Sequence, residues 1–275
     1  MIVQYRAGGI HVYESALFRT VMTLVEGDGY LLLVDPNWLP AEVEFLAAET
    51  ERLRAGRRLY LLFTHSDYDH IIGYGRFPEA TTIASAAFTT NPEVDKVLTQ
   101  IRDFDDAYYL ERSYPIVYPA IDLVVGGATT SLRLGEEEVR FLPADGHNRD
   151  GMLTWFPGRG VLIVGDYLSN IEFPYVYHGV GEYRATLDRL ETLLAGGEVR
   201  LLITGHGDAT TDPAEMHRRL VDSRRYLAEL ETSVRQETPF NLTALFARYR
   251  FPKVMGEFHA GNVQLMECYV AENPE

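Results

Sequence analysis

The feature that most limits what this chain can fold into is the polar segment at 64–70, THSDYDH, which directly follows the apolar run at 59–63. A short, wholly apolar run is typical of a strand that is buried in a parallel sheet. If the polar segment remains extended beyond that strand, alternate side chains share a face. Three candidate ligands would then point one way and the fourth the other way: His65, Asp67 and Asp69, and then His70.

These four side chains offer imidazole nitrogen and carboxylate oxygen, donors that zinc, manganese and iron accept in proteins. The chain has one cysteine, Cys268, so neither an intramolecular disulfide nor a thiolate cage for a metal can form. Any metal would therefore be held by histidine and carboxylate. The alternative interpretation of the segment alone is a polar turn, with a hydrogen-bonded histidine and an aspartate that caps the next helix.

Three more candidate ligands follow expected strands, and each stands beside a glycine: His147, Asp166 and His206. Glycine allows the backbone to bend close to a site, and α/β proteins form their sites where the ends of neighbouring strands meet. The pattern therefore predicts that these three residues converge on the segment at 64–70, and it disfavours the polar-turn interpretation.

The rest of the chain alternates short strands with helices. Strands are expected at 18–25 and 30–34, joined by a hairpin turn, and a helix is expected at 40–54. In the middle, a helix is expected over 92–106, followed by an aromatic, proline-interrupted loop at 108–118. The later elements are five short strands and two helices: strands near 130–134, 138–142, 152–156, 160–165 and 199–204, and helices at 182–195 and 213–236.

No repeat, low-complexity stretch or linker divides the sequence, which predicts a single domain over residues 1–275. Within it, the segment near 85–125 is expected to be an inserted, lid-like segment. The segment near 237–275 is expected to form a C-terminal helical tail. Loops as long as the one in the middle segment often carry function.

The charge of the chain limits its partners. The formal net charge is −15, so phosphate backbones and anionic membrane surfaces would repel it, and neither nucleic acid nor membrane is an expected partner. The N-terminus lacks a secretory pattern and no apolar run is long enough to span a bilayer, which predicts a cytoplasmic location. A small-molecule substrate is expected instead, and a homodimer is the common default for oligomeric state.

The segment THSDYDH, together with the glycine-flanked residues at 147, 166 and 206, resembles the signature of the metallo-β-lactamase superfamily over about residues 10–210. The resemblance implies an α/β (α+β) fold, a four-layer αβ/βα sandwich with metals at one edge of the sheets. Asp35, in LLLVDP, resembles the framework aspartate of that family, which is structural rather than catalytic.

The resemblance also implies a ligand set for two divalent ions, whose identity is left open between zinc, manganese and iron. The first ion would be held by His65, Asp67 and His147, and the second by Asp69, His70 and His206, with Asp166 bridging the two. A hydroxide between the ions would attack the substrate, and Asp69 would take or return a proton as a catalytic residue. The expected activity is hydrolysis of a small ester, lactone, thioester or phosphodiester.

Asp67 departs from the family pattern, which has histidine at this position. With three aspartates and a hydroxide, the inner sphere of two divalent ions is neutral instead of carrying a charge of +1. The extra carboxylate favours harder or more oxidised metals, manganese or iron over zinc. It also keeps open a non-haem di-iron, oxygen-reactive protein that resembles the flavodiiron core, and a non-catalytic metal-bound sensor or scaffold remains the third alternative.

Six further residues are candidates for substrate contact. Two belong to the aromatic loop, which is either a lid or a satellite core or oligomer contact, and three stand in the segment after Asp166, where family members place a pocket loop. The last lies in the C-terminal tail. They are Tyr108, Tyr109, Tyr175, Tyr177, His178 and His259.

Overall fold

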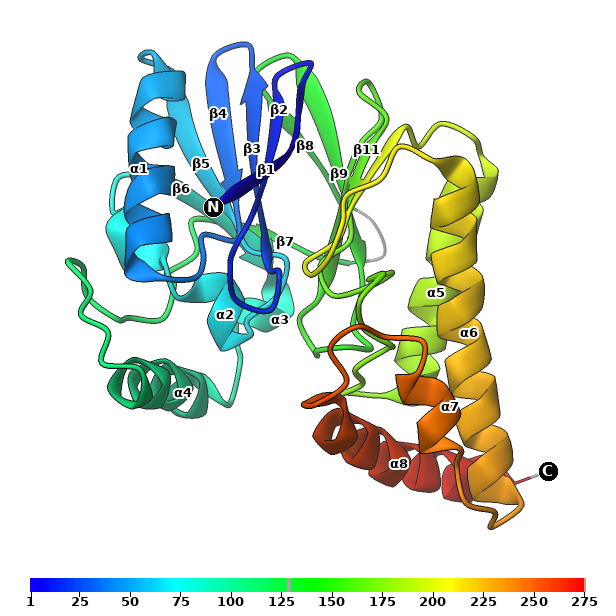
Figure 1. Cartoon of the computed structure of the whole chain (residues 1–275). Coiled ribbons are helices and arrows are strands. Elements are labelled where there is room, and N and C mark those ends of the chain that lie inside the picture. Colours follow the sequence, from blue (N-terminus) through cyan, green and yellow to red (C-terminus); the bar gives the residue numbers. More distant parts are fainter. Residues whose placement is uncertain (128–129, 275) are drawn as a thin grey trace.

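Two β-sheets pack face to face in the computed structural model, which describes residues 1–127 and 130–274, and helices cover their outer faces (Figure 1). Helix α1 (Pro40–Arg54) lies against the first sheet, while α5 (Val180–Ala195) and α6 (Pro213–Arg235) lie against the second. The layers therefore run helix, sheet, sheet, helix. This arrangement confirms the predicted αβ/βα sandwich.

The first sheet has seven strands in sequential order, antiparallel from β1 to β4 and parallel from β4 to β7. They are β1 (Ile2–Ala7), β2 (Ile10–Glu14), β3 (Val21–Gly27), β4 (Tyr30–Val34), β5 (Arg58–Leu62), β6 (Thr81–Ser85) and β7 (Leu123–Val125). Strands β1 and β2 were not expected. Strand β3 begins three residues later than predicted, because Phe18 and Arg19 take positive φ angles of 49° and 50° that no strand accommodates.

The middle segment is tied into the first sheet at both ends. It contains α3 (Ala86–Thr89), α4 (Val94–Ala107) and the edge strand β7, and it starts at the last residue of β6. Helix α4 was predicted to within two residues. The short strand β7 was missed, because three residues carry too little periodic pattern to be recognised.

The second sheet has five strands in the order β12-β11-β10-β9-β8. They are β8 (Thr130–Leu134), β9 (Glu137–Pro143), β10 (Met152–Phe156), β11 (Val161–Ile163) and β12 (Leu201–Ile203), and β12 joins parallel to β11 after the α5 crossover. All five agree with the predicted strands to within a few residues.

Strict alternation along the central strands creates the separate apolar layers. On β4, Leu32 packs between the two sheets, while Leu31 and Leu33 face α1. On β10, Phe156 packs between the sheets and Trp155 faces the helices of the second half. Because side chains on a strand alternate with a period of two, each sheet buries both faces.

Two helices at the C-terminus complete the outer layer of the second half: α7 (Leu242–Phe246) and α8 (Met255–Glu272). Helix α8 crosses beneath α5 and α6 (Figure 1), and Met255 and Met266 join the same apolar cluster as those helices. Among the described helices, none is both long and apolar enough to cross a membrane.

Candidate metal centre

The seven predicted ligands come from four chain segments that meet where the ends of the two sheets face each other. One segment follows β5 and carries His65, and another follows β11 and carries Asp166. His206 follows β12, and His147 lies in the turn between β9 and β10. The residues that sequence alone predicted to converge do so.

The local geometry of 64–70 differs from the expected one. The chain remains extended only as far as Asp67, and helix α2 (Tyr68–Ile71) begins directly after it. Aspartate commonly precedes a helix, and Asp67 takes that position, although its side chain does not cap the helix and turns toward His147 instead. The helical turn, rather than a strand alternation, is what separates His65 and Asp67 from Asp69 and His70.

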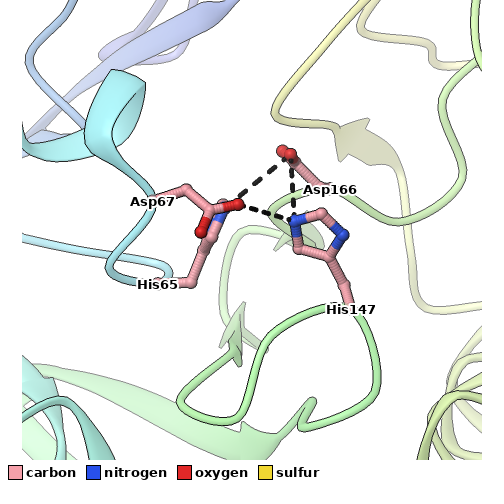
Figure 2. Close-up of side chains that lie close together, drawn as sticks. All are labelled: His65, Asp67, His147 and Asp166. Carbon is pink, nitrogen blue, oxygen red and sulfur yellow. Dashed lines mark hydrogen bonds and ion pairs between the residues drawn. The ribbon is translucent and has the colours of Figure 1, made fainter. Parts of the chain in front are cut away.

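The first group of ligands consists of His65, Asp67, His147 and Asp166, whose donor atoms all lie within 4.8 Å of one another (Figure 2). Asp67 Oδ2 lies 3.5 Å from His65 Nε2 and 3.2 Å from His147 Nε2. Asp166 Oδ2 lies 3.4 Å from His147 Nε2. Both imidazole rings therefore turn the same nitrogen toward the two carboxylates.

The second group consists of Asp69, His70 and His206, and its donor atoms also lie within 4.8 Å of one another. Asp69 Oδ2 lies 3.6 Å from His70 Nε2 and 3.3 Å from His206 Nε2. Asp166 reaches this group as well: its Oδ1 is 3.3 Å from His70 Nε2 and its Oδ2 is 3.4 Å from His206 Nε2. Asp166 is thus placed between the two groups.

Three buried atoms of these groups have no hydrogen-bond partner in the described part of the chain: His65 Nε2, His70 Nε2 and Asp166 Oδ1. Buried polar atoms are normally satisfied, so a converging set without partners indicates a missing ligand. A Cβ atom on Gly205 would come 2.0 Å from Asp166 Oδ1, so glycine is required there for Asp166 to take its place. Nitrogen and carboxylate donors in this arrangement fit two divalent ions.

The other ring nitrogen of each histidine is held by an oxygen. His147 Nδ1 contacts the carbonyl of Tyr175 at 2.7 Å, and His206 Nδ1 contacts the carbonyl of Phe18 at 2.9 Å. Because a carbonyl only accepts, Nδ1 carries the proton in both rings and Nε2 is free to bind a metal.

Asp35 supports the remaining two histidines from the core. Its Oδ2 lies 3.0 Å from His70 Nδ1 and accepts the hydroxyl of Thr64 at 2.6 Å, while its Oδ1 accepts the Thr64 backbone N–H at 2.8 Å. The Thr64 hydroxyl oxygen in turn lies 3.0 Å from His65 Nδ1. Asp35 therefore orients ligands of both groups without being one itself.

The opposite charges of the histidines and aspartates in the site stabilise each other's ionised forms. Burial opposes the charged form of His147, but the carboxylates of Asp67 and Asp166 outweigh it and raise the pKa of His147 to about 9. Burial likewise opposes ionisation of Asp166, but the facing histidines lower its pKa well below the usual value. The facing histidines lower the pKa of Asp67 in the same way, so Asp67 and Asp166 stay ionised and make the site attractive to cations.

Five of the seven candidate ligands line a cavity of about 730 Å³, within the usual size range of small-molecule sites: Asp67, Asp69, His147, Asp166 and His206. His65 and His70 lie behind them. Its walls come from both halves of the molecule, including Trp38 and Tyr68 on one side and Phe258 of α8 on the other. Cationic residues also line it: Lys96 on α4, and Arg149 directly after the His147 turn. A small substrate with polar or anionic groups can therefore reach the metal ligands.

A family model, described as the metallo-beta-lactamase superfamily, matches residues 16–231. The chain belongs to the metallo-beta-lactamase superfamily. The superfamily includes metal-dependent hydrolases, and its members bind divalent metals, which agrees with the two ligand groups found here. No protein of curated function matches the sequence at a significant level.

Solved structures of other superfamily members share the fold. A metallo-beta-lactamase family protein from Thermus thermophilus aligns with a TM-score of 0.67 at 20% identity, covering 97% of this chain and 94% of its own. The sec-alkylsulfatase Pisa1 from Pseudomonas sp. aligns with a TM-score of 0.66 at 15% identity, over 98% of this chain but only 50% of its own. A superfamily protein from Sulfolobus tokodaii aligns over 98% of this chain and 100% of its own, with a TM-score of 0.56 and 17% identity.

Of the residues predicted to contact substrate, three line the cavity: Tyr175, Tyr177 and His178. Tyr108 and Tyr109 do not line this cavity; they follow the end of α4 with 64% and 95% of their surfaces exposed to solvent, and their contact with substrate stays a prediction. Farther along the loop, Tyr114 is buried in the core beneath the first sheet. The part of the middle segment that reaches the cavity is instead 91–100, at the start of α4.

His259 is buried behind the cavity wall. Its Nδ1 lies 3.0 Å from the hydroxyl of Tyr226, and its ring packs on Phe240 with a centroid distance of 4.7 Å. It does not line the metal cavity. The C-terminal tail does reach the cavity, but the side chain that it contributes is Phe258 rather than His259.

Two site residues were missed from the sequence. Asn148 donates its side-chain amide to Asp67 Oδ1 at 2.6 Å. Glu172 lines the cavity, and burial raises its pKa to about 7, aided by the charges of Asp166 and Asp69 and opposed by His206. Asn148 directly follows His147 and Glu172 stands three residues before Tyr175, but a lone amide or carboxylate in a loop carries no periodic pattern that would single it out.

Proposed function

We propose that this protein is a dinuclear metal-dependent hydrolase that cleaves a small ester, lactone, thioester or phosphodiester. The observation that carries the proposal is Asp166, whose two carboxylate oxygens lie within reach of both ligand groups at the floor of a single cavity. Two ions that share one carboxylate lie close enough together to act on one substrate group.

Two divalent ions bound here would supply Lewis acidity and lower the pKa of a water molecule between them toward neutrality. The protein supplies the orientation. Each histidine presents Nε2 to the centre while its Nδ1 is held by an oxygen, so little rearrangement is needed on binding. The carboxylates of Asp67, Asp69 and Asp166 would balance most of the positive charge of two divalent ions.

Asp69 is the residue we assign to proton transfer. Its Oδ2 lies beside His206 Nε2, and its side chain keeps 12% of its surface exposed, at the wall of the cavity. One oxygen can therefore bind a metal while the carboxylate still faces the substrate. Glu172, in the segment after β11, also lines the cavity and would offer a second carboxyl group to the substrate.

Asp67 supports a second candidate function, redox chemistry on a di-iron centre. Three carboxylates around the two groups favour iron or manganese over zinc. Turnover by such a centre would also require an electron donor. Metal identity separates this candidate from the hydrolase.

The test is elemental metal content per chain on protein purified without chelator or immobilised metal, followed by a panel of ester, lactone, thioester and phosphodiester substrates. Two zinc or manganese ions per chain with turnover of one substrate class are the expected result. Two irons with oxygen consumption and no hydrolysis would replace the proposal with the di-iron candidate. Absence of bound metal after reconstitution with each ion would overturn both.

His217→Ala is the matched control for ligand substitutions. His217 is an exposed histidine on α6, away from the cavity, so its loss should change neither metal content nor turnover. His147→Ala should lower both. Equal behaviour of the two variants would contradict the ligand assignment.

A further inference from the structure

A second cavity, of about 640 Å³, opens beside the metal centre. Its walls come from three places: the loop between β2 and β3, the segment after β11, and the connection between α7 and α8. The lining is dominated by apolar side chains, among them Ile171, Phe246 and Met255. No metal-ligand candidate lines this cavity in the described chain.

The second cavity adjoins the metal cavity. Three side chains line both spaces: Phe18, Glu172 and Tyr175. A substrate whose reactive group lay at the candidate ligands would have the apolar space directly on the other side of these three residues. The cavity is placed to receive the distant part of a substrate, rather than an unrelated ligand.

The junction between the cavities offers polar atoms to such a substrate. The Tyr175 hydroxyl is buried and has no hydrogen-bond partner among the described residues, although the ring is fixed by stacking on Phe258 at a centroid distance of 4.1 Å. Glu172 interacts with the charges of the metal site only at longer range. An apolar tail would begin beyond this polar junction.

The rim of the second cavity exposes large apolar side chains to solvent. Phe18, Phe251 and Val254 expose 45%, 48% and 37% of their surfaces there. Exposed apolar groups that gather at a concave site indicate a binding role. Arg250 and Lys253 stand beside them, and the Arg250 guanidinium lies 5.3 Å from the Phe251 ring centroid.

We infer that the second cavity is the tail subsite of the substrate, and that the substrate is an ester or thioester of an unbranched acyl or alkyl chain. This inference rests on the proposed hydrolase function for the position of the scissile group. It assigns a role to the connection between α7 and α8, which lies beyond the residues matched by the family model. It also predicts that activity depends on the length of the acyl or alkyl chain of the substrate.

The test compares p-nitrophenyl acetate, butanoate, hexanoate and decanoate with the metal-loaded protein, each below its micelle concentration. We expect kcat/KM to rise about three- to fourfold for each methylene until the cavity is filled. In parallel, calorimetry of sodium decanoate and sodium hexanoate measures binding without turnover. Decanoate should bind at least about tenfold more tightly than hexanoate.

Two variants, each with an alanine replaced by tryptophan, test the location of the tail subsite. Ala16 is exposed and lines the second cavity but not the metal cavity, so Ala16→Trp should weaken decanoate binding and reduce the dependence of kcat/KM on chain length. Ala271→Trp is the control, because Ala271 is exposed near the far end of α8, about 24 Å along the helix from Met255. It should leave both measurements unchanged.

The outcomes separate the two proposals. Length-dependent binding of decanoate that Ala16→Trp weakens, without hydrolysis of any ester, would retain the tail subsite and overturn the hydrolase. Hydrolysis that does not depend on chain length, with equal binding of decanoate and hexanoate, would overturn the tail subsite alone, even if Ala16→Trp failed to fold. If the protein were a homodimer that Ala16→Trp disrupts, with no change in chain-length dependence, the cavity would be a self-association site. That outcome would also overturn the tail subsite.

Discussion

The two ligand groups differ in how the protein supports them. In the second group, the His70 side chain is fully buried and its Nδ1 is held by Asp35, which is itself buried beneath the first sheet. In the first group, 25% of the Asp67 side chain is exposed, and its Oδ1 is held by Asn148 in a surface turn. Within the second group His70 is therefore built into the core, whereas Asp67 of the first group is open to the cavity and adjustable.

The difference indicates a division of roles. A ligand held by buried hydrogen bonds is positioned before metal binds, which favours retention of the ion. A partly exposed carboxylate on a turn can shift as substrate enters. We therefore expect substitutions around the second group to affect metal retention and folding most, and substitutions in the first group to affect metal choice.

The largest effect should come from removing what the two groups share. Asp166→Ala takes one ligand from each group, so we expect metal content to fall well below two ions per chain and kcat to fall by more than about 100-fold, the upper range for supporting residues. Mass spectrometry of metals and turnover of the best substrate measure this. A variant that kept two metals and full activity would disprove the bridging position of Asp166.

Asp35→Asn should damage the second group more than the first. The amide cannot accept all three hydrogen bonds that Asp35 accepts, so we expect about 10- to 100-fold weaker metal binding and a loss of about 3 kcal/mol in the free energy of unfolding. Urea unfolding and metal titration measure the two effects.

Asp122→Asn is the control for that experiment. Asp122 also accepts hydrogen bonds from a threonine, the backbone N–H and hydroxyl of Thr82, but it contacts no candidate ligand. Its loss should leave metal binding unchanged. If Asp122→Asn weakened metal binding as much as Asp35→Asn, the support of His70 by Asp35 would not be the cause.

Asp67→His tests the first group. Histidine removes one negative charge from the site, so preference should move from manganese or iron toward zinc, by about tenfold in relative affinity. Competition between zinc and manganese for the chelator-treated protein measures the ratio. An unchanged ratio would show that Asp67 does not set metal preference.

The smallest effect concerns Glu172. Burial raises its pKa, the charge of His206 opposes the rise, and the charges of Asp166 and Asp69 add to it. Folding raises this pKa from 4.5 to about 7, so the folded chain retains a proton that the unfolded chain releases in this window. Stability of the metal-free protein should therefore fall as pH rises from 4.5 through 7. Glu172→Gln should remove that loss and be more stable above pH 8, by at most about 3 kcal/mol. Equal pH dependence of both proteins in urea unfolding would contradict the assignment.

The sequence was sufficient to predict which candidate ligands converge, because each follows a local strand pattern, and the family resemblance gave the order of layers. His65, His147 and His206 each stand at a position where an apolar strand gives way to glycine or a polar turn, and strand alternation on β4 and β10 sets the two sheets. The turn of α2 was missed because a four-residue helix is too short to show a helical period.

Features that depend on distant contacts could not be predicted. The support of His70 by Asp35 joins residues 35 positions apart, and the contact of Asn148 with Asp67 joins residues 81 positions apart. The second cavity depends on residues near 16, 171 and 250 coming together in the folded chain. No single stretch of sequence indicates these contacts, because they form only when distant segments pack together.

Antiparallel pairing of Thr20 with His206, and the hydrogen bond from Val21 N–H to the Gly205 carbonyl, join the two sheets at the metal centre. The two halves of the ligand set are consequently made at different times during translation. The residues at 65–70 leave the ribosome long before His206, and at ordinary rates the interval is on the order of ten seconds. During that interval the nascent chain presents two histidines and two aspartates without their partners. Capture of metal by the complete ligand set would thus be a late event in biogenesis, in whichever metal pool surrounds the chain after the second sheet has docked.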